Sequence, residues 1–432
     1  MEQNTNVSVT LTSELRLEQA LHIEDPASVS KLTVSGMLTE DDFKYIRKNM
    51  ANTLKELDMS NADVEEDTIP RSAFSYCFAL NSVIIPDSVR RIGNSTFEFC
   101  TGLRSVSIPN RVRFVGDSAF FGCIGLIAIV IENGFTSIGN CSFFHCPSLI
   151  SVEMGNNVST IGSYAFHGCT RLTSVRIPAS VVDIGYAAFS GCSKLAAFEV
   201  ASDNVFYASI DGVLFDKSKE FLKACPVGKQ GVYSIPAGVK KICDNAFAGC
   251  AKLTSIVFPD SVVTIGSKAF YECAALSPSL TIPEGVKSIG SEAFYGCTAL
   301  FGINIPASAA AIGTGAFDKC INLEEINVAS DYSRSGMLLS KTGKTLIRCP
   351  EGKQGVYTVS RSVEAIDNKA FEGCAKLTSI ILSDSVKILG ENMLVGCTGL
   401  ISVIHIPEGG RILHGMISFV ENSKSIDTRR NG

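Results

Sequence analysis

Twelve of the sixteen cysteines recur at nearly constant intervals along the 432-residue chain. Successive members are 23 residues apart, once 24, and two steps are longer, at 58 and 54 residues. Single cysteines at a fixed period mark a repeated structural unit rather than a disulfide framework. The members are Cys77, Cys100, Cys123, Cys146, Cys169, Cys192, Cys250, Cys273, Cys297, Cys320, Cys374 and Cys397.

The clearest copy of the unit is LTSVRIPASVVDIGYAAFSGC, residues 172–192. Its first half has the period-two spacing of a short strand that points Val175 and Ile177 inward and Arg176 outward. Pro178 ends this strand because proline has no amide hydrogen to donate to a ladder. Gly185 then supplies a turn at which a positive φ is expected.

Units stacked in parallel place equivalent residues about 4.8 Å apart, so each repeated position becomes a column. The sequence therefore predicts a leucine-rich-repeat β-solenoid of about 12 to 14 stacked repeats of about 23 residues, with parallel strands. Burial of each Phe in such a column should contribute about 1.5 to 3 kcal/mol. The Phe column comprises Phe74, Phe97, Phe120, Phe143, Phe166, Phe189, Phe247, Phe270, Phe294, Phe317 and Phe371, with Leu394 in the last copy.

The cysteine column is interpreted as a row of small buried thiols. Neighbouring Cα atoms lie within disulfide reach, but parallel Cβ vectors would strain the bridge. A metal site would need clustered ligands such as C-x-x-C pairs, and the sequence has none. Cys225 and Cys349 lie off the period at equivalent places, and a structural role is favoured for both. No metal and no cofactor is expected.

The period divides the chain into blocks. Residues 1–65 do not follow it and are predicted to form an atypical α/β cap, with a helix over residues 39–50. The expected order then continues with a first repeat block at 66–200, a hairpin insertion at 201–231, a second repeat block at 232–328, a hairpin insertion at 329–355, a third repeat block at 356–407 and a tail at 408–432.

The two insertions are related to each other. ACPVGKQGVYSIP in the first recurs as RCPEGKQGVYTVS in the second, 124 residues later. Each insertion contains two short apolar runs around polar turn residues, which is typical of a hairpin. Cys243 and Asp367 replace the turn glycine in the unit that follows each insertion, so the local turn geometry should differ there.

Charge and hydropathy exclude two classes of partner. The net charge is −5 and the basic residues are scattered, so no basic stripe is available for nucleic acid. No apolar stretch approaches the roughly 18 residues that a membrane-spanning helix needs. The first residues lack the pattern of a secretory signal.

The unit IPxSVxxIGxxAFxGC, seen here as IPDSVRRIGNSTFEFC and IPASVVDIGYAAFSGC, resembles that of the BspA-like leucine-rich-repeat proteins. The resemblance extends over residues 66–407. It implies a surface or secreted location and a role in adhesion, through host proteins or contacts between cells. It supplies no ligand-binding motif that could be carried over to particular residues.

No constellation for catalysis is apparent, so the chain is predicted not to be an enzyme. His145 and His167 come from adjacent repeats, but they occupy different places in the unit and should not stack in register.

The outward positions of the strands offer a candidate ligand surface. Its members are Glu153, Arg176, Glu199, Asn304 and Asn327. These residues are either solvated cross-strand neighbours, worth about 0.2 to 1 kcal/mol per pair, or part of a polar site for a protein or glycan. The alternative function is that of a structural protein, in which weak self-association occurs through the insertions or the solenoid edges.

Overall fold

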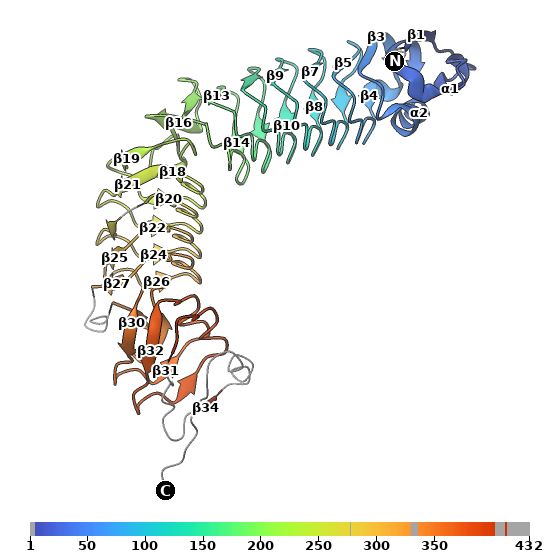
Figure 1. Ribbon diagram of the computed structural model, residues 1–432. Helices are drawn as coiled ribbons and strands as arrows, with labels where there is room; N and C mark the ends of the chain where they lie inside the picture. Colours follow the sequence, from blue (N-terminus) through green and yellow to red (C-terminus); the bar gives the residue numbers. More distant parts are fainter. Residues whose placement is uncertain (1–4, 277, 330–335, 402–410, 413–432) are drawn as a thin grey trace. The chain divides into compact units, whose positions relative to one another are not determined.

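The computed structural model describes residues 5–276, 278–329, 336–401 and 411–412. The chain divides into two compact units, residues 1–218 with 225–229 and residues 219–224 with 230–432. Each unit is a stack of parallel-strand turns (Figure 1). The leucine-rich-repeat solenoid predicted from the sequence is thus confirmed.

The two units together contain about 16 turns, so the expectation of 12 to 14 was too low. The reason is that strands outside the cysteine period join the same ladders. In the first unit, β3 of the cap pairs in parallel with β5 of the first repeat. In the second unit, the insertion strand β29 pairs in parallel with β31.

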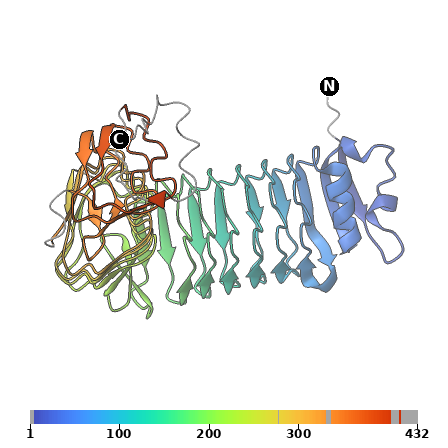
Figure 2. The same cartoon turned by 90° about the horizontal axis from the view of Figure 1, so that it is seen from below.

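The first unit begins with an α/β cap. The α2 helix starts after Thr39, whose N–H donates to the Asp42 carboxylate at 2.9 Å. The buried Asp42 also accepts from the Leu17 N–H and pairs with Arg16 at 3.1 Å. The helix lies across the end of the stack (Figure 2). The cap elements are β1 (Thr5–Thr10), α1 (Leu17–Ala20), η1 (Pro26–Ser28), β2 (Val29–Leu38), α2 (Glu40–Met50), β3 (Glu56–Val64) and η2 (Glu65–Asp67).

The repeats of the first unit contribute two rows of strands. The longer row continues the face of β1 to β3 with β5 (Ser82–Ile84), β7 (Ser105–Ser107), β9 (Ala128–Ile131), β11 (Ser151–Met154), β13 (Ser174–Ile177) and β15 (Ala197–Val200). The shorter row is a six-stranded ladder of β4 (Thr68–Ile69), β6 (Arg91–Ile92), β8 (Phe114–Val115), β10 (Ser137–Ile138), β12 (Thr160–Ile161) and β14 (Asp183–Ile184). An antiparallel pair follows, β16 (Tyr207–Ile210) with β17 (Val213–Asp216).

The second unit repeats this plan. Its shorter row is formed by β18 (Phe221–Ala224), β20 (Lys241–Ile242), β22 (Thr264–Ile265), β24 (Ser288–Ile289) and β26 (Ala311–Ile312), and then by a separate sheet of β28 (Leu338–Leu339), β29 (Thr345–Arg348), β31 (Ala365–Ile366), β33 (Ile388–Leu389) and β34 (Arg411–Ile412). Its longer row consists of β19 (Gly231–Ser234), β21 (Leu253–Val257), β23 (Ser279–Thr281), β25 (Gly302–Ile305), β27 (Glu325–Val328), β30 (Gly355–Thr358) and β32 (Leu377–Ile381).

The predicted phenylalanine column forms the core of each unit. Phe120, Phe143 and Phe166 are fully buried, and their rings stack 5.1 Å apart with interplanar angles of 3°. In the second unit, Phe270 and Phe294 stack at the same spacing. The constant spacing follows from the strand ladders, because each ring lies one turn above the equivalent ring.

The turn glycine has a different role from the one expected. Gly185 does not have a positive φ; instead, a Cβ on it would lie 2.4 Å from the Ser163 backbone nitrogen of the preceding turn. The left-handed backbone occurs two residues later, at Ala187, with φ of 50°. Glycine is therefore required here because successive turns approach each other closely, not because of its own backbone angles.

Within the described ranges, no helix combines the length and the apolar character needed to span a membrane.

Candidate binding surface

The outward residues of the longer strand row in the first unit are exposed, as expected. Arg176 on β13 lies directly opposite Glu199 on β15 in the strand register, and Glu153 on β11 lies opposite Val130 on β9. Among the residues that the structure describes, no ion pair joins Arg176 to either glutamate. The three side chains thus present separate charges to solvent on one face.

The equivalent face of the second unit carries a hydrogen-bonded row. The Asn327 side-chain amide donates to Asn304 Oδ1 at 3.2 Å, and the Asn304 amide donates to Thr281 Oγ1 at 3.3 Å. The strand register brings these side chains together, since Asn304 on β25 is paired with both Thr281 on β23 and Asn327 on β27. The sequence indicated the two asparagines and missed the threonine.

The two histidines lie in adjacent turns of the first unit but do not stack on each other. His167 stacks on Phe144 instead, with ring centroids 4.6 Å apart. Burial lowers the pKa of His167, and the neighbouring His145 lowers it further. A neutral imidazole packed against a phenylalanine fits a structural role for this residue.

The cysteine column has a function that the sequence interpretation did not include. Cys169 Sγ donates to the Phe143 carbonyl oxygen of the preceding turn at 3.2 Å, and the same contact recurs along the column. Burial raises the pKa of the Cys169 thiol to about 12. All sixteen cysteines lie in the described residues and are free thiols. The column therefore joins successive turns by thiol-to-carbonyl hydrogen bonds, and its thiols are poor nucleophiles.

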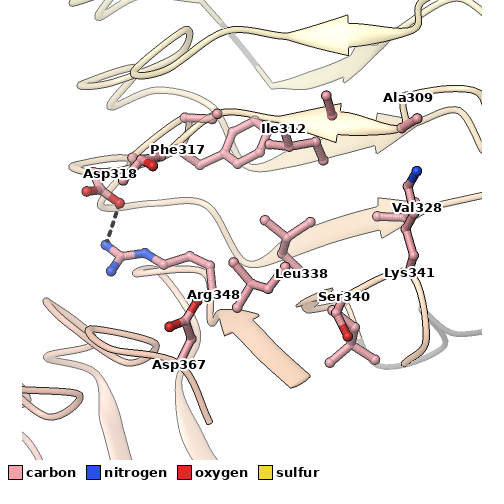
Figure 3. A pocket seen from close by; sticks show the side chains of 18 of the residues that line it. Ala309, Ile312, Phe317, Asp318, Val328, Leu338, Ser340, Lys341, Arg348 and Asp367 are labelled. Carbon is pink, nitrogen blue, oxygen red and sulfur yellow. Dashed lines mark ion pairs between the residues drawn. The ribbon is translucent and has the colours of Figure 1, made fainter. Parts of the chain in front are cut away.

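A cleft of about 780 Å³ lies inside the second unit, between the β26 turn and the second insertion. Ile312, Phe317 and Leu338 line its middle, Arg348 and Asp318 lie at one end, and Lys341 lies at the other (Figure 3). This volume falls within the range of about 300 to 1,000 Å³ that is typical of ligand pockets. The remaining lining includes the small residues Ala307, Ala309, Ala310, Ala311, Gly313 and Gly315.

A buried ion-pair cluster forms the charged end of the cleft. Arg348 is 8% exposed, and its guanidinium contacts the Glu351 carboxylate at 2.7 Å and the Asp318 carboxylate at 3.1 Å. It also donates to the Lys369 carbonyl oxygen at 2.7 Å. Glu351 in turn accepts from the Lys319 N–H at 2.8 Å. This cluster fixes the insertion against the turns on both sides of it.

The cleft was not predicted, although the sequence carries two signals for it. Asp367, which replaces the turn glycine, lines the cleft together with Gly313. The three alanines 309–311 replace Val181, Val182 and Asp183 of the equivalent repeat 128 residues earlier. Both departures from the repeat lie where one turn lacks a directly stacked neighbour.

Comparison with known proteins identifies the family. The model described as BspA type Leucine rich repeat region matches residues 67–196, 229–337 and 356–430, in six copies. The chain belongs to this family. The resemblance that the repeat unit indicated is therefore confirmed.

Several solved structures have the same BspA-type repeat. A leucine-rich cell surface protein from Faecalibacterium prausnitzii is 30% identical, with 77% of this chain and 90% of that one covered and a TM-score of 0.54. A leucine-rich repeat protein from Bacteroides ovatus is 22% identical, with coverage of 91% and 86% and a TM-score of 0.48. The pneumococcal vaccine antigen PcpA is 20% identical, with coverage of 78% and 85% and a TM-score of 0.49. No curated protein matches the chain.

Proposed function

We propose that this BspA-type chain is a non-catalytic scaffold at the cell surface that binds a host protein or glycan in adhesion. The observation that carries the proposal is its 30% identity, over most of both chains, to a leucine-rich cell surface protein. The exposed strand rows support it, since they hold charged and amide side chains on a rigid lattice of stacked turns. Such a surface recognises a partner by complementarity over many turns and needs no catalytic group.

The proposal is tested by measuring binding of the purified chain to extracellular-matrix proteins and to a glycan array. A ligand found in this way is then tested against the double charge reversal Arg176→Glu with Glu199→Arg, which should weaken binding about tenfold or more if this face is used. Unchanged affinity removes the face from consideration, and the absence of any surface ligand contradicts the proposal.

A matched control exists on the cap. Lys31 on β2 and Glu56 on β3 are exposed register partners that form an ion pair at 2.9 Å. Reversal of both charges perturbs the same kind of cross-strand pair away from the proposed surface. The control should leave ligand affinity unchanged, because an exposed ion pair contributes only about 0 to 1 kcal/mol to stability.

The second candidate function is self-association, and exposed apolar residues of the first insertion favour it. Val205 is 68% exposed and Phe206 is 48% exposed, side by side in the sequence. Light scattering of the native chain and of a variant lacking residues 212–224 measures the mass of the particle. A monomer in both cases contradicts self-association.

A further inference from the structure

Two repeat turns have no regular turn stacked directly after them, because an insertion follows each. Their short strands end at Ile184 on β14 and Ile312 on β26, which are equivalent positions 128 residues apart. Both side chains are only half-buried, whereas the equivalent Ile161 and Ile289 in the preceding turns are buried. Each of these turns therefore ends a ladder and leaves backbone groups that need partners.

In the first insertion the chain supplies those partners itself. Asn204 is fully buried, and its side-chain amide donates to the carbonyl oxygens of Pro178 at 2.8 Å and Val181 at 3.0 Å. Three residues later, the Tyr207 hydroxyl accepts from the Ile184 N–H at 3.1 Å. An asparagine and a tyrosine thus close the exposed end of the β14 turn.

The same segment is held in two further ways. It continues into β16, which pairs antiparallel with β17, placing Ser209 opposite Leu214. The Lys217 ammonium donates to the carbonyl oxygens of Ser202 and Asn204. Residues 202–210 therefore form an extended segment bound through one amide side chain, one phenol, one strand edge and one lysine.

The second insertion is four residues shorter at this point. Twelve residues run from Ala201 to Gly212, but only eight run from Ala329 to Gly336. From the glycine onward the insertions align again, so that Leu214 corresponds to Leu338 and Lys217 to Lys341. The shortening removes the counterparts of Asn204 and Tyr207 from their places in the alignment, and the cleft lies at this position (Figure 3).

The groups that bind the segment in the first insertion have counterparts around the cleft. Gly313 donates back to Ile289 at 2.8 Å, so the alternation of a parallel ladder points the Ile312 N–H into the cleft. In the described part of the chain, Lys341 has no hydrogen bond or ion pair, and β28 pairs with β29 alone. An amide donor, a strand edge and a cation are thus available together.

We propose that the cleft binds an extended peptide segment of a partner protein that carries asparagine and, three residues later, tyrosine. The segment pairs antiparallel with β28, as β16 does with β17, and its asparagine caps the carbonyl oxygens of Pro306 and Ala309. The tyrosine hydroxyl accepts from the Ile312 N–H. Lys341 complements the partial negative charge of the backbone carbonyl oxygens, and strand addition of this kind gives affinity through main-chain hydrogen bonds.

The probe is a fluorescein-labelled peptide with the sequence SDNVFYASI, residues 202–210 of this chain. Fluorescence anisotropy should show saturable binding to the native chain. A peptide with alanine in place of the asparagine should bind about tenfold more weakly or worse, because two carbonyl acceptors lose their donor. Absence of binding by the parent peptide, or equal binding by both peptides, overturns the proposal.

Occupancy of the cleft is tested with a blocking variant and a matched control. Ala310→Trp places a large side chain at an exposed position that lines the cleft, and it should abolish peptide binding. Val182→Trp makes the same change at the equivalent position of the first unit, where the chain closes the turn itself. Equal loss in both variants, or loss in neither, shows that the peptide binds elsewhere.

A graft keeps the test decisive if the tryptophan variant does not fold. Replacement of residues 329–336 by residues 201–212 restores the missing counterpart segment within the chain. The graft should fold and no longer bind the peptide, and a graft that folds but still binds contradicts the proposal. The inference rests on the proposed scaffold function only for its biological use. Loss of peptide binding with matrix or glycan binding intact would reject the cleft alone.

Discussion

The two insertions interrupt the same repeat at equivalent places, yet they leave different structures behind. In the first insertion, Asn204 and Tyr207 close the exposed end of the preceding turn. In the second, four fewer residues are present and a cleft of about 780 Å³ lies at the equivalent place. The difference shows that a solenoid needs no new fold to gain a candidate binding site. Shortening the segment that closes a turn is sufficient.

The insertions also differ in how they are fixed to the neighbouring turns. The buried cluster of Asp318, Arg348 and Glu351 in the second insertion replaces Ser190, Ala224 and Val227 at the equivalent places of the first. Ion pairs thus hold the open insertion, whereas side-chain hydrogen bonds to backbone groups hold the closed one. Buried ion pairs must offset the cost of desolvation, so removal of one partner is more harmful than replacement of the whole cluster.

The largest expected effect concerns the phenylalanines at the two ladder ends. Phe189→Ala should reduce the free energy of unfolding by about 3 to 5 kcal/mol, because it leaves a cavity between Phe166 and Phe198. Phe317→Ala should cost less, because the space that it vacates opens into the cleft and can be reached by water. Urea unfolding followed by circular dichroism measures both. Equal losses would indicate that the cleft is closed in solution.

The second prediction removes the group that closes the first insertion. Asn204→Ala should destabilise the end of the first unit by about 2 to 3 kcal/mol, since the buried amide makes hydrogen bonds to Pro178, Val181 and its own loop. Hydrogen exchange at residues 178–190 should accelerate. Asp203→Ala changes an exposed neighbour and serves as the control. If exchange is the same in both variants, Asn204 is not what closes this turn.

Much of this architecture could be predicted from the sequence because stacking repeats one chemical choice at every turn. The inward strand residues, the Phe column and the free thiols all follow from a period of 23 residues. The helix after Thr39 could likewise be predicted from its capping residues and first-turn acids. These features depend on local sequence and on one neighbour of known identity.

The candidate sites could be predicted only in part. The outward positions of Arg176 and Asn304 follow from strand alternation, and the structure places both on exposed faces. The cleft could not be predicted, because it depends on a missing segment and on residues that belong to no column. The departures at Asp367 and Ala309 were visible as letters, but their meaning needed the three-dimensional neighbour that each lacks.

The third prediction uses the turn glycine to distinguish a stacked turn from an open one. Gly313→Ala should cost about 1 to 3 kcal/mol, because the new Cβ would lie 2.2 Å from the Ser291 backbone nitrogen. Asp367→Ala, at the equivalent turn position across the cleft, should change stability by less than about 0.5 kcal/mol. Differential scanning calorimetry measures both shifts in Tm. A large loss at Asp367 would show that a neighbour stacks on it as tightly as on Gly313.

The smallest expected effect comes from partial refilling of the cleft. Ala309→Val restores the residue that occupies the equivalent position in the first unit, Val181, which is fully buried. Burial of the added methyl groups should stabilise the chain by about 0.5 to 1 kcal/mol, because Ile312 and Leu338 line the same space. Urea unfolding measures the gain.

The control for this change is Val181→Ala, which makes the reverse substitution where Asn204 already covers the turn. It should destabilise by about 1 to 3 kcal/mol, since the cavity is enclosed and cannot be filled by water. The two changes together determine whether the difference between the insertions lies in the shortened segment or in the alanines. A gain at Ala309 that equals the loss at Val181 would mean that the turn before the second insertion is as well covered as the first. The cleft would then be too narrow to accept a peptide.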